Sequence, residues 1–346
     1  MKSRDTIVLT TALSLLTSAA SIAADFQVEL GEPVTVANPK PGVPIYPWFP
    51  DGHITVLPDK AGLQMYWAGS ASYRTVGAAV DTMRLSPANP ILAKGEPATA
   101  FDNGGAWLYS VVAVSNADYI GFYHAEDHQW HPGRSAEGVA WKSVALCTSG
   151  DGGATWSKKG QILTSARQKP DLPAWGGCGD HCVVFDKGRW FCFFQEHYLC
   201  MAVSDDKQAL PGTWKKWYNG GFNEPGLGGK VSPIEGLVTR PGGNPSVHYN
   251  TELQRWFMVW HTWTGNLVYS WSRDLIRWEP PVDLLKCAAN TKLWYPTIVG
   301  STDTQAGKEA ALYYAFWPDK TRWERQFIRR TIRFVPKAGT IPIQSR

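Results

Sequence analysis

The chain has 346 residues, with 34 basic and 30 acidic side chains and a formal net charge of +4. Hydrophobic residues make up 44% of the chain and charged residues 18%, so it can bury a large core, which excludes wholesale disorder. The small, scattered excess of positive charge is not typical of a nucleic-acid-binding protein. The chain also has 33 Gly, 24 Pro and 18 Trp residues. This composition predicts many turns, and aromatic side chains that can stack on sugar rings or pack in a core.

The first 24 residues have the pattern of a secretory signal peptide. A short basic start precedes an apolar run from Ile7 to Ile22, and small residues follow. The pattern predicts export to a secreted or periplasmic location, with cleavage after Ala23 or Ala24. No second apolar stretch approaches the ~18 residues that a membrane span needs. We therefore expect residues 25–346 to form one domain without a membrane span.

Five segments of the mature chain share one layout of short strands. Each begins with an apolar strand and a tight turn, and its second strand ends in polar or aromatic residues. The segments cover residues 52–93, 106–163, 180–218, 244–285 and 296–335. The last segment lacks a fourth strand, while residues 26–36 offer a strand without a hairpin partner. Such repeats predict an all-β, five-bladed β-propeller of four-stranded antiparallel blades, in which the N-terminal strand completes the last blade and closes the ring.

All six cysteines lie in the mature part of the chain. They are Cys147, Cys178, Cys182, Cys192, Cys200 and Cys287. An even number of cysteines in an exported chain predicts one to three disulfides without specifying the pairs.

A specific motif occupies the turn that follows the third strand of the second repeat. The residues from Ser149 to Trp156 read S-G-D-G-G-A-T-W, which matches the Asp-box pattern S-x-D-x-G-x-T-W of sialidase propellers. In this motif the Asp and Ser side chains hydrogen-bond the turn backbone and the Trp packs between strands. We therefore expect a structural role for Asp151.

The layout of the mature chain resembles that of the five-bladed β-propeller glycoside hydrolases, the superfamily of arabinanases, β-xylosidases and β-fructosidases. The resemblance implies hydrolysis of glycosidic bonds in an extracellular polysaccharide or oligosaccharide, with arabinan or another furanoside-containing glycan favoured. It implies no required cofactor. Some members of the superfamily hold a central cation, so a structural Ca²⁺ is compatible with the resemblance, but no ligand set in the sequence is diagnostic of one.

Propeller geometry brings the residues just before the first strand and just after the second strand of each blade to one mouth of the central tunnel. The turns between third and fourth strands, with Asp151, Ser204 and Asp274, fall on the opposite face. Beside the catalytic candidates, the residues expected to bind substrate at the mouth are Trp67, Asp102, His124, Asp127, His128, His181, His197, Asn244, Trp260, His261 and Tyr295.

Four carboxylates are the catalytic candidates. Asp51 matches the position of the superfamily's base or nucleophile, and Asp180 matches that of the aspartate that orients the acid and modulates its pKa. The superfamily's acid, usually a Glu that opens the fourth blade, has no counterpart, because Asn244 stands there. Glu126, within the segment HAEDH, is the first candidate for the acid and Glu196 the second. We expect inversion, with Asp51 as the base that activates water.

Two alternatives stay open. A sialidase-like exo-glycosidase is compatible with the Asp box, although Arg74 and Arg134 are the only natural candidates for its three-arginine clamp. A non-catalytic carbohydrate-binding propeller is compatible with the aromatic mouth and with the missing acid of the fourth blade. The sequence predicts no oligomeric state.

Overall fold

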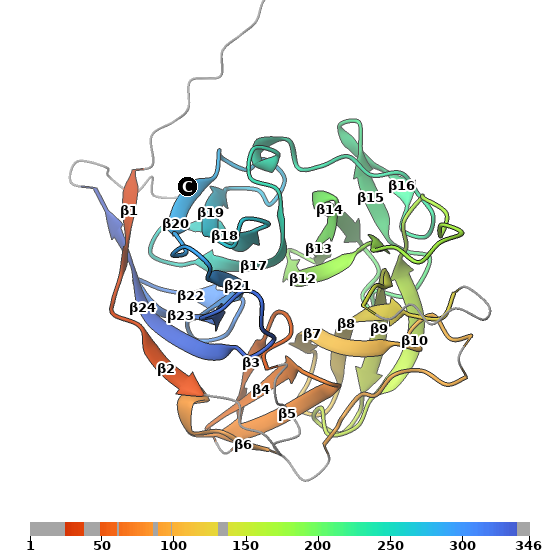
Figure 1. Ribbon diagram of the computed structural model, residues 1–346, viewed down its shortest axis with the longest axis horizontal. Coiled ribbons are helices and arrows are strands. Elements are labelled where there is room, and N and C mark those ends of the chain that lie inside the picture. Colours follow the sequence, from red (N-terminus) through yellow and green to blue (C-terminus); the bar gives the residue numbers. More distant parts are fainter. Residues whose placement is uncertain are drawn as a thin grey trace, which may run out of the picture.

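The computed structural model describes residues 25–37, 49–60, 62–85, 89–97, 99–130 and 138–337. The expected signal peptide and its cleavage site lie outside these residues. Figure 1 shows five antiparallel sheets arranged around a common centre, so the prediction of a five-bladed β-propeller is confirmed. No helix in the described part of the chain is long and apolar enough to cross a membrane.

The strands follow one another in chain order from the centre of the propeller outwards. Blade 1 contains β3 (Thr55–Asp59), β4 (Gly62–Ala68), β5 (Ser72–Gly77) and β6 (Arg84–Leu85). Blade 2 contains β7 (Gly105–Ala113), β8 (Tyr119–Asp127), β9 (Trp141–Ser149) and β10 (Ser157–Leu163), with β11 (Gly176–Gly177) parallel to β9. Blade 3 contains β12 (Gly179–Asp186), β13 (Arg189–Glu196), β14 (Tyr198–Ser204), β15 (Lys215–Tyr218) and β16 (Gly221–Pro225).

The two remaining blades complete the ring. Blade 4 contains β17 (Gly242–Asn250), β18 (Arg255–Thr262), β19 (Leu267–Ser272) and β20 (Val282–Leu285), with β22 (Gln305–Ala306) parallel to β17. Blade 5 contains β21 (Lys292–Val299), β23 (Glu309–Trp317), β24 (Gln326–Pro336), β1 (Phe26–Leu30) and β2 (Val34–Ala37). Two short 3₁₀ helices lie at Val80–Thr82 and Glu235–Leu237.

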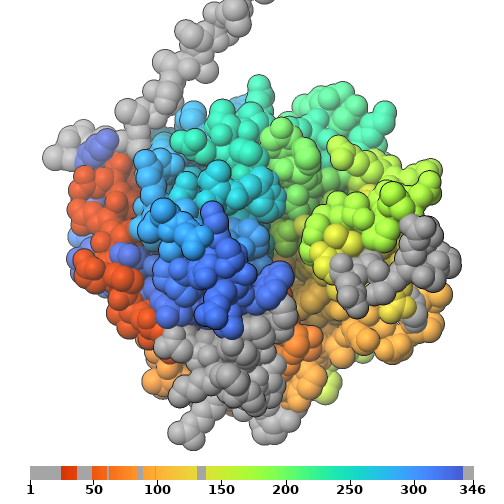
Figure 2. Space-filling view, viewed as in Figure 1, coloured from red at the N-terminus to blue at the C-terminus, as the bar shows by residue number. Residues whose placement is uncertain are grey.

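The N-terminal strands close the ring as predicted. β1 pairs antiparallel with the end of β24, so that Gln27 faces Val335, and β2 pairs with the beginning of β24, so that Val34 faces Arg329. In Figure 2 the red N-terminal segment lies against the blue C-terminal part of the chain. Phe26 is buried between the blades, with its ring 5.1 Å from that of Trp271 in blade 4. The outer edge of the last blade is therefore covered by β1 and β2.

Five apolar clusters fill the five interfaces between neighbouring blades. Because successive side chains of a strand point to opposite faces of its sheet, each blade contributes to two clusters. In β13, for example, Phe193 packs toward blade 4, whereas Cys192 and Phe194 pack toward blade 2. This burial of both faces explains why the inner strands are nearly continuous apolar runs.

Hydrogen bonds also link the innermost strands around the tunnel. In each case a backbone N–H of one blade donates to a side-chain hydroxyl of the preceding blade. The pairs are Val111 to Thr55 (3.2 Å), Val183 to Ser110 (3.0 Å), Ile298 to Ser246 (3.4 Å) and Ile54 to Thr297 (3.3 Å). These bonds fix the height of the blades relative to one another, and with it the positions of the strand ends at the tunnel mouth.

The prediction of disulfides is wrong, because all six cysteines are free thiols in the structure. Five of them are buried within the blade interfaces. Cys182 and Cys192 belong to neighbouring strands, yet their side chains enter different apolar clusters on the two faces of blade 3. The buried thiols thus serve as small apolar core residues.

The turn after β9 uses its polar side chains internally. Asp151 accepts hydrogen bonds from the backbone N–H groups of Ala154 (3.0 Å) and Thr155 (2.9 Å), and Ser149 accepts one from Gly153 (2.9 Å). Asp151 is exposed and does not line the cavity described below.

Candidate functional site

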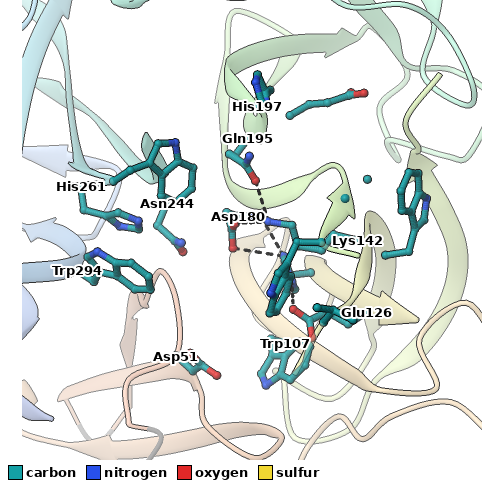
Figure 3. A pocket seen from close by; sticks show the side chains of 18 of the residues that line it. Asp51, Trp107, Glu126, Lys142, Asp180, Gln195, His197, Asn244, His261 and Trp294 are labelled. Atoms are coloured by element: carbon teal, nitrogen blue, oxygen red, sulfur yellow. Dashed lines mark hydrogen bonds and ion pairs between the residues drawn. The ribbon is translucent and has the colours of Figure 1, made fainter. Parts of the chain in front are cut away.

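A cavity of about 1140 Å³ occupies the mouth of the tunnel, and residues of all five blades line it. All four candidate carboxylates line this cavity, and Figure 3 shows how Asp51 and Glu126 lie in it. The residues predicted to bind substrate that also line it are His124, His128, His197, Asn244, His261 and Tyr295. The prediction that strand starts and strand ends converge at one mouth therefore places these side chains together.

The first strands of blades 3, 4 and 5 have the same backbone conformation where they reach the cavity. Asp180, Asn244 and Tyr295 have positive φ values of 49°, 50° and 54°. At each of them the register with the second strand shifts, which marks a β-bulge. Bulges turn a side chain away from the regular alternation of a strand. The bulges direct Asp180, Asn244 and Tyr295 into the cavity from equivalent positions of three blades.

Glu126 is held by two histidines at the end of β8. The Nε2 atom of His124 lies 3.0 Å from one carboxylate oxygen, and that of His128 lies 2.8 Å from the other. Burial by itself would raise the pKa of Glu126, but the hydrogen bonds and charges of the two histidines outweigh it and bring the pKa to about 2. Glu126 is therefore an ionised carboxylate at neutral pH.

Asp180 connects this group to blade 3. Its backbone N–H donates to Nδ1 of His124, across 2.9 Å. Lys142 donates to the Asp180 carboxylate and to the Gln195 side chain, each across 2.7 Å (Figure 3). Burial acts to raise the pKa of Asp180, but the charge and the hydrogen bond of Lys142 hold it well below its usual value. Asp180 is thus a second ionised carboxylate, and it is paired with Lys142.

Asp51 has a different electrostatic environment. Burial raises its pKa, and the nearby Glu126 charge adds to this effect, while the Arg325 guanidinium opposes it. One Arg325 nitrogen lies 3.2 Å from the Asp51 carboxylate, which also accepts a hydrogen bond from the Tyr295 hydroxyl. The cavity therefore contains one carboxylate with a raised pKa and, close to it, one with a strongly lowered pKa.

Tyr109 forms part of the cavity wall beneath these carboxylates. Its ring stacks on His124, with the ring centres 5.3 Å apart. Burial and the surrounding carboxylates raise its pKa well above the usual value, so its hydroxyl is neutral. Gly52, next to Asp51, has a φ of +127°, and a Cβ there would lie 2.1 Å from the Tyr109 ring. The glycine of the Pro-Asp-Gly segment is thus needed for Asp51 to approach this wall.

Aromatic side chains form much of the remaining wall and rim. The tryptophans that line the cavity are Trp107, Trp141, Trp175, Trp263, Trp294, Trp317 and Trp323. Trp175 and Trp323 are 60% and 63% exposed, so their indole faces are open to a ligand. His261 stacks on Trp294 with the ring centres 4.7 Å apart, and burial lowers its pKa to about 3. Flat, partly exposed aromatic rings around buried polar groups suit the binding of sugar rings.

Two tryptophans predicted to bind substrate lie in the core instead. Trp67 stacks on Tyr73 within the interface between blades 1 and 5, and Trp260 lies in the interface between blades 3 and 4. Each is fully buried and does not line the cavity. Trp260 is the strand neighbour of His261, which does face the cavity, and successive side chains point to opposite faces. The position at the mouth was predicted correctly, but the face of the sheet was not.

Asp102, Asp127 and His181 are also outside the cavity lining. Asp102 accepts a hydrogen bond from Lys158 (2.5 Å), and Asp127 accepts one from Lys169 (2.5 Å). Both carboxylates are buried and fix the loops behind the mouth. His181 is buried behind Tyr109, with the ring centres 5.4 Å apart. These three residues support the site rather than face a ligand.

Four further residues line the cavity although the sequence pattern did not predict them there, namely Trp141, Lys142, Lys292 and Arg325. Trp141 and Lys142 open the third strand of blade 2, and Lys142 lies directly opposite Glu126 in the sheet. In the hairpin formed by the second and third strands of a blade, the start of the third strand lies beside the end of the second. The starts of the third strands could therefore have been predicted at the mouth as well. Arg325 stands in the loop before β24, and no local pattern marks it.

No group of three or more His, Cys, Asp or Glu side chains among the described residues is arranged to hold a metal ion.

Two solved structures show the same fold at low sequence identity. One is a family 117 glycoside hydrolase produced by the marine bacterium Zobellia galactanivorans, with a TM-score of 0.55, 10% identity, and coverage of 91% of this chain and 92% of the other. The second is an exo-1,5-α-L-arabinanase from a bovine ruminal metagenomic library, with a TM-score of 0.52, 9% identity, and coverage of 81% and 92%. No protein-family model matches the chain, and no curated protein sequence matches it. The fold is thus that of the five-bladed propeller glycoside hydrolases.

Proposed function

We propose that the protein is an exported glycoside hydrolase that cleaves glycosidic bonds of an extracellular polysaccharide or oligosaccharide in this cavity. The observation that carries the proposal is that Asp51 and Glu126 line one cavity whose wall contains several tryptophans. Glycoside hydrolysis needs one carboxyl group that holds a proton and one carboxylate that is ionised. The raised pKa of Asp51 and the lowered pKa of Glu126 shift the two groups in the directions that these two roles favour.

The pKa shifts favour roles opposite to those expected from the sequence. With a pKa of about 2, Glu126 is ionised at neutral pH and is poorly suited to donate a proton. The raised pKa of Asp51 suits a general acid. In the proposed reaction Asp51 gives its proton to the leaving glycosidic oxygen while the bond from that oxygen to the anomeric carbon breaks. A water molecule attacks the anomeric carbon from the other face and gives its proton to Glu126, so the anomeric configuration is inverted.

The other polar residues position these two groups. The backbone of Asp180 and the side chain of His124 hold Glu126, while Tyr295 and Arg325 hold Asp51. Glu196 accepts a hydrogen bond from Ser165 across 2.5 Å on the blade 3 side. We assign it to substrate binding, together with His197 and Asn244.

The substrate class and the setting are part of the proposal. A furanoside-containing glycan such as arabinan is favoured by the sequence resemblance, and one structure with the same fold is an exo-1,5-α-L-arabinanase. The signal-peptide pattern supports action in a secreted or periplasmic location. The proposed chemistry uses protein carboxyl groups and water and requires no cofactor, and a structural Ca²⁺ would be additional to it.

A carbohydrate-binding propeller without catalysis is the second candidate. It is favoured by Asn244, which stands where the superfamily usually has its acid and whose buried Oδ1 atom has no hydrogen-bond partner among the described residues. An amide at this place can bind a sugar hydroxyl but cannot donate a catalytic proton. The sialidase-like alternative has less support, because Arg74 bonds to Gln64 within blade 1 and does not line the cavity, and Arg134 lies outside the described residues.

A polysaccharide panel distinguishes the two candidates. The mature protein would be incubated with arabinan, other furanoside-containing glycans and pyranoside controls, and both binding and released reducing ends would be measured. The proposed function predicts new reducing ends from at least one glycan that binds. Binding without any release would support the non-catalytic candidate.

A further inference from the structure

Lys292 is a cation of the cavity wall with no acidic partner among the described residues. It begins β21, and its side chain shares a face of the strand with Trp294 and lies opposite Trp317 of β23. Its ammonium group lies 3.9 Å from the centre of the Trp294 ring and 4.7 Å from that of Trp317. No described carboxylate forms an ion pair with it. The two indole faces thus hold the ammonium group at the cavity without neutralising it.

A second cation stands beside it. The Arg325 guanidinium lies 4.7 Å from the centre of the same Trp317 ring. Arg325 forms an ion pair with Asp51, whereas Lys292 forms none with any carboxylate in the part of the chain that the structure describes. Burial, together with the Arg325 charge, lowers the pKa of Lys292 from its usual value, which shows that the ammonium group is held at a cost. Cation–π contacts offset only part of such a cost.

We propose that Lys292 binds an anionic substituent of the sugar, so that within the proposed furanoside-containing class the enzyme prefers an acidic glycan over a neutral one such as arabinan. The inference rests on the proposed function for the identity of the ligand as a glycan. A neutral sugar would leave the ammonium group unneutralised, whereas a carboxylate or sulfate would form a charge-assisted hydrogen bond with it. The Trp317 ring contacts both Lys292 and Arg325, and Arg325 pairs with Asp51, so the anionic group would lie on a sugar near the cleaved bond.

Two sugar classes carry such an anionic group, namely uronic acids and sulfated sugars. Binding of each anionic ligand and of its neutral counterpart distinguishes the two classes. We would measure binding by calorimetry with oligogalacturonate and its carboxyl-reduced neutral counterpart, and with a sulfated galactan oligosaccharide and its desulfated counterpart. Both pairs would be tested at low and at moderate salt, because screening weakens an exposed ionic contact.

Three variants make the test specific. Lys292→Met keeps the aliphatic stem against the indoles but removes the charge, and Lys292→Arg keeps the charge. Lys207→Gln removes an equal charge from an exposed lysine between β14 and β15, outside the cavity. We expect the wild type to prefer one anionic ligand over its neutral counterpart by about tenfold or more, as one charged hydrogen bond can provide. Lys292→Met should lose this preference, while Lys292→Arg and Lys207→Gln should keep it.

The inference is overturned if the wild type binds no anionic ligand more tightly than its neutral counterpart, or if Lys292→Met keeps the preference. Unfolding of Lys292→Met would be detected by its thermal melting, and the preference of Lys292→Arg then serves as the test. Cleavage is scored separately, by the release of reducing ends. A preference for an anionic ligand without cleavage would contradict the proposed hydrolase but support the anionic subsite. Cleavage of neutral glycans without such a preference would support the hydrolase and contradict the anionic subsite.

Discussion

The backbone N–H of Asp180 donates to Nδ1 of His124 across 2.9 Å, so Nε2 of His124 carries the proton that faces Glu126 at 3.0 Å. The bulge that gives Asp180 its positive φ therefore also fixes the tautomer of a histidine in the neighbouring blade. Through this contact, a backbone feature of blade 3 helps keep a carboxylate of blade 2 ionised.

The contact predicts a shift of the acid limb of the pH–rate profile. His124→Phe keeps a ring between Trp107 and Tyr109 but removes the N–H that faces Glu126. Without this donor the pKa of Glu126 should rise from about 2 toward its ordinary value of 4.5, so activity should be lost at a higher pH on the acid side. His181→Phe is the matched control, because His181 stacks on the same Tyr109 ring and makes no hydrogen bond to Glu126. Equal acid limbs in wild type and His124→Phe would contradict the assignment.

Glu126 should also make the fold pH-dependent. Its pKa in the folded protein is about 2, below the ordinary 4.5, so its stabilising contribution is present above pH 4.5 and is lost as the pH falls toward 2. A shift of this size corresponds to roughly 3 kcal/mol. Chemical denaturation of wild type and Glu126→Gln should therefore show a difference in unfolding free energy that shrinks between pH 4.5 and pH 2. A difference that stays constant over this range would show that the histidines do not stabilise the carboxylate.

The ring closure predicts a large effect of a residue far from the cavity. Phe26→Ala should lower the free energy of unfolding by about 3 kcal/mol, because it leaves a void between β1 and blade 4. Activity per folded molecule should be unchanged. Val34→Ala in β2 is the control, since Val34 is 46% exposed. Equal urea midpoints for the two variants would mean that β1 contributes little to the last blade.

The free cysteines predict a definite thiol count. Without reductant, a thiol reagent should modify partly exposed Cys287 in the native protein and all six cysteines in denaturant. The other five are buried, and burial raises the pKa of Cys178 to about 12, which further slows its reaction. Fewer than six reactive thiols in denaturant would reveal a disulfide.

The fold could be predicted from the sequence because the same pattern of strands is repeated five times. Each of the five segments carries the same order of strands, and the strand at residues 26–36 fits the one missing place. Apolar side chains on both faces of strands such as β13 then follow from packing between blades. The disulfide prediction failed because it rested on composition and compartment, whereas Cys182 and Cys192 enter different faces of one blade.

The site was predictable in position but not in chemistry. Propeller geometry identified the mouth, and Asp51 and Glu126 lie there. It did not say which of the neighbours Trp260 and His261 faces the cavity, because successive side chains of a strand point to opposite faces of the sheet. The roles of Asp51 and Glu126 depend on charges from other blades and loops, such as Arg325. These contacts exist only once the ring has closed, so no local pattern of residues contains them.

Turnover and binding by Asp51→Asn provide the most direct test of the account. With the glycan identified by the panel, we expect this variant to bind it about as tightly as the wild type and to release reducing ends about a thousandfold more slowly, because an amide cannot donate the proton. The loss should be much smaller for an aryl glycoside whose leaving group needs little protonation. An Asp51→Asn variant that cleaves the natural glycan at the wild-type rate would contradict the proposed catalytic pair.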